Sequence, residues 1–383
     1  MKIVYIYEAI ARIGGIERVF VEKMNYLAEV YNYDVFLITS SQGRHPYSFT
    51  LSPKITHFDI SVPFHSQYKY KRFTRLWKKI QLEQIFEKQL QLKIKEINPD
   101  IIISTSNFKP DVICQLKCNA KKIIESHCAR SYTGVNDGVN RNRLMQWLHG
   151  LQIKRVYKLI EHKCDIVVTL TQNDFTEWRR AKKVQIIPNM TQVVTSNNGI
   201  KKKSNHVISI GRMSYQKGFD RLISAWEIVK QKHANWSLDI YGDNGTLKFD
   251  LEKQIKELRL ANEIAIHGPT NEITRKYQET EFYVMSSRYE GWGLVLVEAM
   301  TCGIPCVSFD CPHGPSDIIK NGVNGILVKN GDIQGLADAI CWMIEHEEER
   351  KRMGIAAKET SKKYAPEVIM KQWNELFKEL VRK

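Results

Sequence analysis

Short apolar segments rich in Ile and Val recur along the chain and alternate with stretches whose apolar residues have helical spacing. In the first half these segments are KIVYIY, YDVFLITS, DIIISTS, KKIIESH and DIVVTLT. Parallel strands need a crossover between them, usually a helix, so this alternation predicts a buried parallel sheet. The pattern restarts after about residue 200 with VISIGR, WSLDIYGD, EIAIHG, EFYVMSS and IPCVSFD. We therefore expect an α/β protein with two doubly wound halves.

The two halves are expected to join in the polar, turn-rich stretch IPNMTQVVTSNNGIKKKSNH. We place the first domain at residues 1–195 and the second at residues 196–365. Pro366 breaks the last regular segment of the second domain, because proline cannot occupy a helix interior without loss of a hydrogen bond. A final helix at residues 366–383 is expected to pack back against the first domain. Its apolar residues share one face: Ile369, Trp373, Leu376, Phe377 and Leu380.

Length and composition suit a globular protein that works in the cytoplasm. The chain has 383 residues, of which 43% are hydrophobic and 26% are charged. It shows neither a signal-peptide pattern nor a run of about eighteen apolar residues. The eight cysteines are expected to be reduced thiols. Three cysteines and a histidine cluster late in the chain, but their spacing matches no common zinc pattern, and we expect no metal site there: Cys302, Cys306, Cys311 and His313.

Positive charge is concentrated in one part of the chain. The formal net charge is +15, and residues 61–160 hold 19 Lys and Arg against 7 Asp and Glu. An anionic partner is expected to meet this region. Within it, YKYKRFTRLWKKI predicts a basic amphipathic helix with an apolar stripe of Phe73, Leu76, Trp77 and Ile80. The stripe either packs on its own domain or lies on an anionic membrane. The basic residues beside it are Lys71, Arg72, Arg75, Lys78 and Lys79.

Two loops carry residues suited to a ligand. In RYEGWGLVLVEAM, Glu290 and Glu298 lie eight residues apart around a Gly-Trp-Gly turn. Glycines let the backbone approach a ligand closely, and the following residues favour a helix. After the strand VISIGR, Arg212 and Lys217 precede a helix that begins near Gly218. Two cations at the carboxyl end of a strand suit a diphosphate. Neither G-x-G-x-x-G after a first strand nor a P-loop is present, which disfavours a nicotinamide enzyme.

Taken together, these motifs resemble glycosyltransferase family 4, the retaining nucleotide-sugar enzymes with the GT-B fold. The second half carries GRMSYQKGFDRLI, YGDNG, IHGPTNEI, SSRYEGWGLVLVEAMTCGIPCVS and GPSDIIKNGVNGILV in the family's order. The first half adds Gly14-Gly15 after its first strand and ESH at residues 125–127. The resemblance implies two Rossmann-like domains that face each other across a cleft. It also implies a hexosyltransferase whose first domain binds the acceptor and whose second domain binds the nucleotide-sugar donor.

The resemblance also implies roles for individual residues. Glu298 is expected to accept hydrogen bonds from the donor ribose, since a carboxylate has two acceptor oxygens for two vicinal hydroxyls. Glu290 and His127 are expected beside the transferred sugar. Arg212 and Lys217 are expected to stabilise the diphosphate leaving group, so that neither a divalent metal nor another cofactor is required. Further donor contacts are expected at Gly15, Gly242, Pro269, Gly291, Gly293, Leu294 and Val295.

Donor, acceptor and stereochemical route are narrower expectations. FDCPHGPSDII resembles bacterial enzymes that use UDP-hexoses or UDP-N-acetylhexosamines to build surface or lipid-linked glycans, including lipopolysaccharide; GDP-mannose is the alternative donor. The resemblance implies that the anomeric configuration is retained. Either Glu290 attacks the anomeric carbon as a nucleophile, or the acceptor attacks it from the leaving group's own face. The basic residues Arg72, Arg75, Lys78 and Lys79, with Trp77, are expected to hold the enzyme peripherally on the inner face of the cell membrane. A GT-B epimerase and a nucleic-acid-binding protein are alternatives; the latter explains only the charge.

Overall fold

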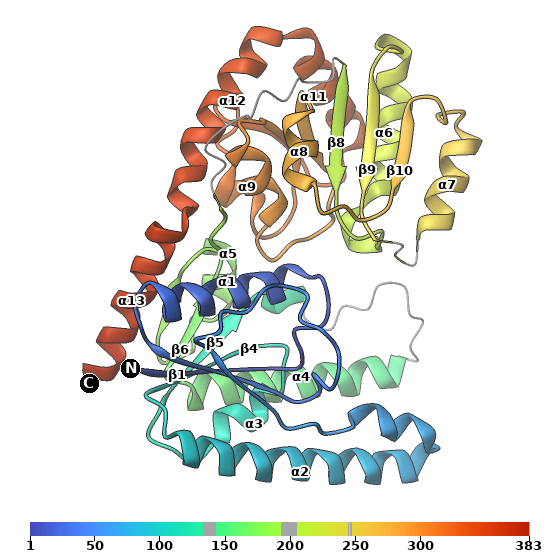
Figure 1. Cartoon of the computed structure of the whole chain (residues 1–383). Helices are drawn as coiled ribbons and strands as arrows, with labels where there is room; N and C mark the ends of the chain where they lie inside the picture. Colours follow the sequence, from blue (N-terminus) through green and yellow to red (C-terminus); the bar gives the residue numbers. More distant parts are fainter. Residues whose placement is uncertain (133–142, 193–204, 244, 246, 383) are drawn as a thin grey trace.

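The computed structural model describes residues 1–132, 143–192, 205–243, 245 and 247–382. Each half of the chain builds its own parallel sheet with covering helices, and the two halves lie one above the other (Figure 1). The α/β class expected from the alternating segments is therefore confirmed. The expected junction near residue 200, with the boundary between residues 195 and 196, lies outside the described residues.

The described part of the first half contains a sheet of seven parallel strands in the order β3-β2-β1-β4-β5-β6-β7. Its strands are β1 (Lys2–Tyr7), β2 (Asp34–Thr39), β3 (Thr56–Asp59), β4 (Ile101–Thr105), β5 (Lys121–Ser126), β6 (Ile166–Thr169) and β7 (Val184–Ile186). Its helices, with short 3-10 turns marked η, are α1 (Gly15–Glu29), η1 (Phe64–Lys69), α2 (Arg72–Ile97), α3 (Pro110–Gln115), η2 (Arg130–Tyr132), α4 (Arg143–Lys163) and α5 (Gln172–Glu177).

The second half contains, among its described residues, six parallel strands in the order β10-β9-β8-β11-β12-β13. They are β8 (His206–Ile210), β9 (Ser237–Tyr241), β10 (Ile264–His267), β11 (Phe282–Met285), β12 (Cys306–Asp310) and β13 (Gly325–Lys329). The helices are η3 (Tyr215–Lys217), α6 (Phe219–Lys232), α7 (Lys248–Glu257), α8 (Ile273–Gln278), α9 (Leu294–Thr301), α10 (Pro315–Ile318), α11 (Ile333–Glu345), α12 (Glu347–Ser361), η4 (Lys362–Tyr364) and α13 (Pro366–Arg382).

Three strands were not expected from the sequence, and all three lie at sheet edges. β3 and β7 end the first sheet, and β13 ends the second. The segments of β3 and β7 are only four and three residues long, and none of their residues is fully buried. An edge strand has one neighbour and partly faces solvent, so it lacks the long apolar run that marks a central strand.

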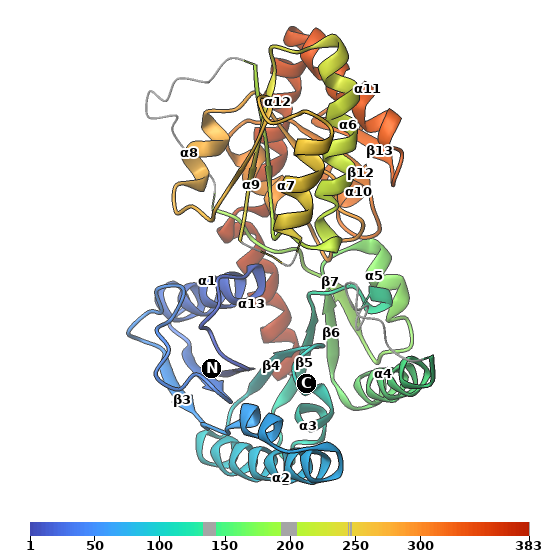
Figure 2. The same ribbon diagram turned by 90° about the vertical axis from the view of Figure 1, so that its right-hand side faces the viewer.

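The last helix returns to the first half, as the two views show (Figures 1 and 2). α13 begins at Pro366, and the apolar residues expected on one face, including Trp373 and Phe377, are buried. Asn374 accepts a hydrogen bond from the Tyr33 hydroxyl at 2.6 Å, and Glu379 pairs with Lys183 at 2.6 Å. α13 therefore packs on α1 and fastens the end of the chain to the first sheet.

The long helix α2 has two different halves. Its later turns bury Leu82, Phe86, Leu90 and Ile94 in the first-half core. Its first turns leave Phe73 87% exposed and Trp77 74% exposed, and Leu76 and Ile80 are exposed as well. The interpretation in which this stripe packs on its own domain is therefore wrong, because the helix start projects beyond the sheet. In the described part of the chain, every helix is too short or too polar to cross a bilayer.

Candidate active site

The loop between β11 and α9 holds the first glutamate of the pair. Glu290 is buried, and its Oε1 accepts hydrogen bonds from Lys217 Nζ and Ser287 Oγ, both at 2.6 Å. Lys217 ends η3, in the loop that follows β8. The carboxyl ends of parallel strands lie at one edge of a sheet, which is why residues 73 positions apart meet. The structure thus brings Lys217 to Glu290.

Arg212 follows the same strand but lies apart from this pair. Its side chain is 66% exposed, and its Nε lies 3.7 Å from Asp243 Oδ2. A pair this exposed contributes little to stability, since water screens both charges. Arg212 is thus a weakly held cation beside the cleft. Gly242 lies against the backbone just before Arg212, since a Cβ on Gly242 would lie 1.9 Å from the Gly211 carbonyl oxygen. Pro269 is exposed in the loop after β10.

The second glutamate lies on α9 and is held from both halves of the chain. Glu298 Oε1 accepts from Arg18 Nη1 at 2.5 Å, and its Oε2 accepts from the Tyr277 hydroxyl at 3.3 Å. Arg18 belongs to α1 and also pairs with Glu22 at 2.9 Å. Burial, with a smaller contribution from the Glu298 charge, raises the pKa of Tyr277 well above its usual value, so this hydroxyl is a donor at neutral pH. Glu298 therefore accepts hydrogen bonds from donors of both halves.

Two helix starts face each other near these glutamates. α1 begins at Gly15, and a Cβ on Gly15 would lie 3.2 Å from Leu294 Cδ1 at the start of α9. Gly293 caps α9 with φ of +93°, a conformation that favours glycine, and Val295 is the next residue of its first turn. The first N–H groups of a helix lack partners within the helix and attract anions. This arrangement can bind a phosphate between the halves.

His127 lies across the cleft from the Glu290 loop. It follows β5, and its Nε2 lies 2.8 Å from Glu125 Oε2. A Cβ on Gly291 would lie only 2.0 Å from the His127 carbonyl oxygen. The two main chains therefore touch where a side chain cannot fit. Trp292 is buried behind this turn and packs edge-on against Tyr364 with ring centroids 5.3 Å apart.

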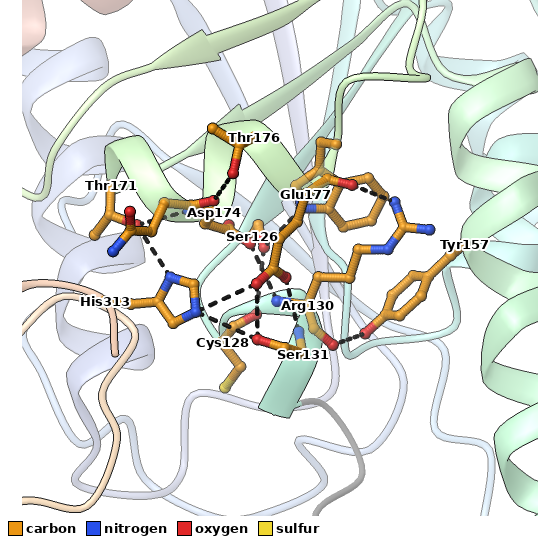
Figure 3. Close-up of polar contacts among 12 residues, drawn as sticks. Ser126, Cys128, Arg130, Ser131, Tyr157, Thr171, Asp174, Thr176, Glu177 and His313 are labelled. Carbon is orange, nitrogen blue, oxygen red and sulfur yellow. Dashed lines mark hydrogen bonds and ion pairs between the residues drawn. The ribbon is translucent and has the colours of Figure 1, made fainter. Parts of the chain in front are cut away.

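A second contact between the halves surrounds His313. Figure 3 shows its ring pointing toward residues of the first half. The Nε2 atom lies 3.3 Å from Ser131 Oγ and 3.4 Å from Glu177 Oε1, and Nδ1 lies 3.5 Å from Thr171 Oγ1. Burial lowers the pKa of His313 and outweighs the opposing charges of Glu177 and Asp317. His313 therefore acts as a neutral contact between the halves. No group of three or more His, Cys, Asp or Glu in the described ranges is arranged to hold a metal ion.

A cavity of about 650 Å³ opens beside Glu290 and is lined by both halves. Tyr132 and Tyr289 stack across its wall with ring centroids 4.6 Å apart. The Ser106 hydroxyl lines it and is buried with no hydrogen-bond partner among the described residues. Further polar residues along the cavity come from five elements and loops: Lys79, Asn107, His149, Gln152, Gln216 and Glu290.

Comparison with known proteins identifies this arrangement. The family model of glycosyl transferases group 1 matches residues 192–360. An uncharacterized glycosyltransferase of Haemophilus influenzae is 26% identical over 97% of this chain and 98% of that protein. The amylovoran biosynthesis glycosyltransferase AmsD of Erwinia amylovora is 28% identical over 98% of this chain and 99% of its own length. Residues 192–360 therefore match the group 1 glycosyltransferases, and the two relatives that match the chain over its whole length are glycosyltransferases as well.

Solved structures show the same fold for this glycosyltransferase. The sucrose-phosphate synthase of Thermosynechococcus elongatus superposes with a TM-score of 0.81 at 19% identity, covering 99% of this chain and 98% of that chain. HepE of Anabaena, solved with UDP, gives a TM-score of 0.73 at 18% identity and covers 99% and 100%. These likenesses confirm the expected GT-B fold, with two Rossmann-like halves across a cleft.

Three residues of the site were not predicted from the sequence: Arg18, Lys23 and Tyr277. Arg18 and Tyr277 contact Glu298 from helices whose own patterns look ordinary. Lys23 left a signal, because it stands among the buried residues Phe20, Met24 and Leu27 of α1. A lysine at a core position of an amphipathic helix predicts a buried anionic partner.

Proposed function

We propose that this glycosyltransferase transfers a hexosyl or N-acetylhexosaminyl group from a UDP-sugar to a glycan or lipid-linked acceptor during synthesis of a surface polysaccharide. Residues 1–195 with 366–383 would bind the acceptor, and residues 196–365 the donor. The observation that carries the proposal is the ion pair of Lys217 with Glu290 at the mouth of a cavity lined by both halves.

The donor roles follow from the chemistry of each group. Glu298 presents two carboxylate oxygens to the ribose hydroxyls. Arg212, exposed to the cleft, and Lys217, with two further donor protons beyond its bond to Glu290, would stabilise the negative charge that grows on the departing diphosphate. The starts of α1 and α9 add backbone N–H groups. This charge stabilisation requires no metal ion.

Relatives support UDP as the nucleotide and a surface polymer as the product. HepE has been solved with UDP-glucose. The poly(ribitol-phosphate) alpha-N-acetylglucosaminyltransferase of Staphylococcus aureus is 34% identical over 44% of this chain. AmsD is named for the biosynthesis of amylovoran. AmsD and the Staphylococcus aureus protein are named for the class of reaction proposed for this chain.

The environment of Glu290 supports attack of the acceptor on the leaving group's own face. A carboxylate is a stronger nucleophile when fewer hydrogen-bond donors and cations stabilise its negative charge. In this chain an ammonium and a hydroxyl both bind the same oxygen of Glu290, which stabilises its charge and weakens it as a nucleophile. Glu290 then serves to hold the sugar and Lys217, with His127 on the opposite side.

The cavity beside Glu290 is the acceptor site in this proposal. Stacked aromatic rings, a buried hydroxyl and solvent-accessible amide groups suit a sugar, which offers apolar ring faces and many hydroxyls. Tyr132 and Tyr289 provide the rings, and Ser106 provides an unsatisfied hydroxyl. Lys79, from the basic helix α2, lines the same cavity. The anionic part of a lipid-linked acceptor would meet this lysine.

A donor screen tests the proposal. Thermal unfolding is followed with UDP-, GDP- and ADP-sugars, because a ligand that binds only the native state raises the melting temperature. We expect UDP-glucose or UDP-N-acetylglucosamine to raise it and GDP-mannose to leave it unchanged. Stabilisation by GDP-mannose alone would contradict the donor assignment. The failure of every nucleotide sugar to stabilise the chain would contradict the function itself.

The exposed start of α2 supports peripheral binding to an anionic membrane. Each Lys or Arg near such a surface contributes up to about 1 kcal/mol, and Phe73 and Trp77 are exposed for shallow burial. We expect a variant with Glu at positions 72, 75, 78 and 79 to lose sedimentation with anionic liposomes while its UDP affinity stays the same. Reversal of Lys253 and Lys256 on α7 is the matched control. Undiminished sedimentation of the α2 variant would remove this helix from the mechanism.

A further inference from the structure

A chain of three buried polar side chains ends at His127. Lys23 Nζ donates to Glu125 Oε2, and the same oxygen lies 2.8 Å from His127 Nε2. The three side chains are 3%, 1% and 2% exposed, respectively. None of the roles assigned above uses Lys23 or Glu125. Their burial therefore calls for a separate explanation.

Sequence and topology place the three residues in line. Side chains alternate along β5, so Ile123, Glu125 and, just past the strand, His127 point to the same face of the sheet. α1 covers that face and presents Lys23 to Glu125. The Lys23 ammonium also lies 4.3 Å from the ring centroid of Trp373, so α13 closes over it. This cation–π contact offsets part of the cost of burial.

The ionised Glu125 carboxylate determines which nitrogen of the His127 ring carries the proton. Burial would raise the pKa of Glu125, but the Lys23 charge and the hydrogen bond from His127 outweigh it, and the pKa of Glu125 lies below its usual value. Burial lowers the pKa of Lys23, and Glu125 opposes that change. An ionised carboxylate only accepts hydrogen bonds, so His127 Nε2 carries the proton. Nδ1 is then the nitrogen available to a ligand.

We propose that Lys23 and Glu125 are positioning residues for His127: Glu125 fixes the orientation and tautomer of the imidazole, and Lys23 holds the Glu125 carboxylate in place and balances its charge. This inference rests on the proposed role of His127 beside the transferred sugar. A neutral Nδ1 can accept a hydrogen bond from a sugar hydroxyl, whereas an imidazolium cannot.

Packing alone does not explain the arrangement. Apolar residues of similar volume usually stabilise a core at least as well as a buried ion pair. The chain of contacts leads to the cleft, because the His127 carbonyl abuts Gly291 next to Glu290. Phe20 packs edge-on against the His127 ring with centroids 5.6 Å apart and blocks rotation on one side. The ion pair thus lies where it can hold a ring at the reacting sugar.

The test compares Glu125→Gln and Lys23→Met with wild type in steady-state transfer from UDP-glucose or UDP-N-acetylglucosamine. We expect each variant to lower kcat about 10- to 100-fold and to change the donor KM by less than about threefold. On a His127→Ala background, Glu125→Gln should cost less than about twofold, because it acts through the histidine. Lys122→Met, on the same strand and bonded to backbone carbonyls, is the matched control and should keep its kcat.

Nitrogen NMR of labelled histidine gives a readout that does not depend on turnover. Wild type should show the His127 proton on Nε2, and Lys23→Met should change the His127 ring-nitrogen signals, because it removes the charge that balances Glu125. If Lys23→Met does not fold, the double variant Lys23→Met/Glu125→Gln removes both buried charges and should fold without regaining kcat.

Three outcomes would overturn the inference. They are an unchanged kcat in the folded variants, an equal cost of Glu125→Gln with and without His127, and an unchanged His127 spectrum in Lys23→Met. A wild-type enzyme that turns over no nucleotide sugar would instead contradict the proposed function. The two failures are therefore distinguishable.

Discussion

The contact between Gly291 and the His127 carbonyl allows a test of whether the reaction requires the two halves to lie this close together at the site. In Gly291→Ala the new Cβ would lie 2.0 Å from that oxygen, whereas an ordinary contact begins at 3.4 Å. The halves must therefore part locally by about 1.4 Å. Gly291 is not among the positive-φ glycines, so alanine adds the clash without backbone strain. A misplacement of about 1 Å costs on the order of 10²-fold in rate.

We expect Gly291→Ala to lower kcat about 100-fold while the Kd for UDP changes by less than about threefold. Transfer is measured with the donor found in the stabilisation screen, and UDP affinity by calorimetry. Gly150→Ala on α4 is the matched control, because a Cβ there meets no atom within 4 Å, and it should keep both values. Wild-type kcat in a folded Gly291→Ala protein would refute the requirement for this close approach.

Three more predictions follow from the same geometry. Glu298→Ala should weaken UDP binding about 10- to 100-fold, whereas Glu290→Ala should keep the affinity for UDP and lower kcat about 10²-fold. Equal losses of UDP affinity in both variants would refute the assignment of Glu298 to the ribose and Glu290 to the sugar. Turnover should survive EDTA, and loss that Mn²⁺ restores would contradict charge stabilisation by protein cations alone. Burial raises the pKa of Asp174 to about 6. The free energy of unfolding should therefore fall by about 3 kcal/mol as pH rises from about 4 to 6, because the unfolded state ionises this carboxyl more readily. Urea unfolding should show that Asp174→Asn removes this fall.

The sequence predicted those parts of the fold and site whose pattern is local. Ten strands stand out as apolar runs, and the final helix stands out by its spacing, because burial on one or both faces dictates residue type over adjacent positions. Glu290 and Glu298 stand out because glycines surround a loop that must approach a ligand. Lys217 was expected beside a diphosphate, but its hydrogen bond to Glu290 could not be predicted from the sequence of its own loop.

What the sequence did not predict depends on distant contacts. Arg18 meets Glu298 across 280 positions, and neither helix carries a sign of the other. The exposure of Phe73 and Trp77 is another case. Their spacing alone fits a helix packed on its domain equally well, and only the extent of the sheet beneath α2 decides that the first turns project past it.

The division of the site between the halves has a thermodynamic consequence. Glu298 draws one partner, Arg18, from the first half, and the cavity is walled by Tyr132 from the first half and Tyr289 from the second. Any ligand that contacts both walls binds the closed arrangement more tightly than an open one and so shifts the molecule toward closure. If the proposed donor and acceptor each contact both walls, they favour the same arrangement, and linkage requires that each raise the affinity of the other by the same factor. Closure around both proposed substrates would exclude water from the anomeric carbon, which would protect the donor from hydrolysis and direct the sugar to the acceptor.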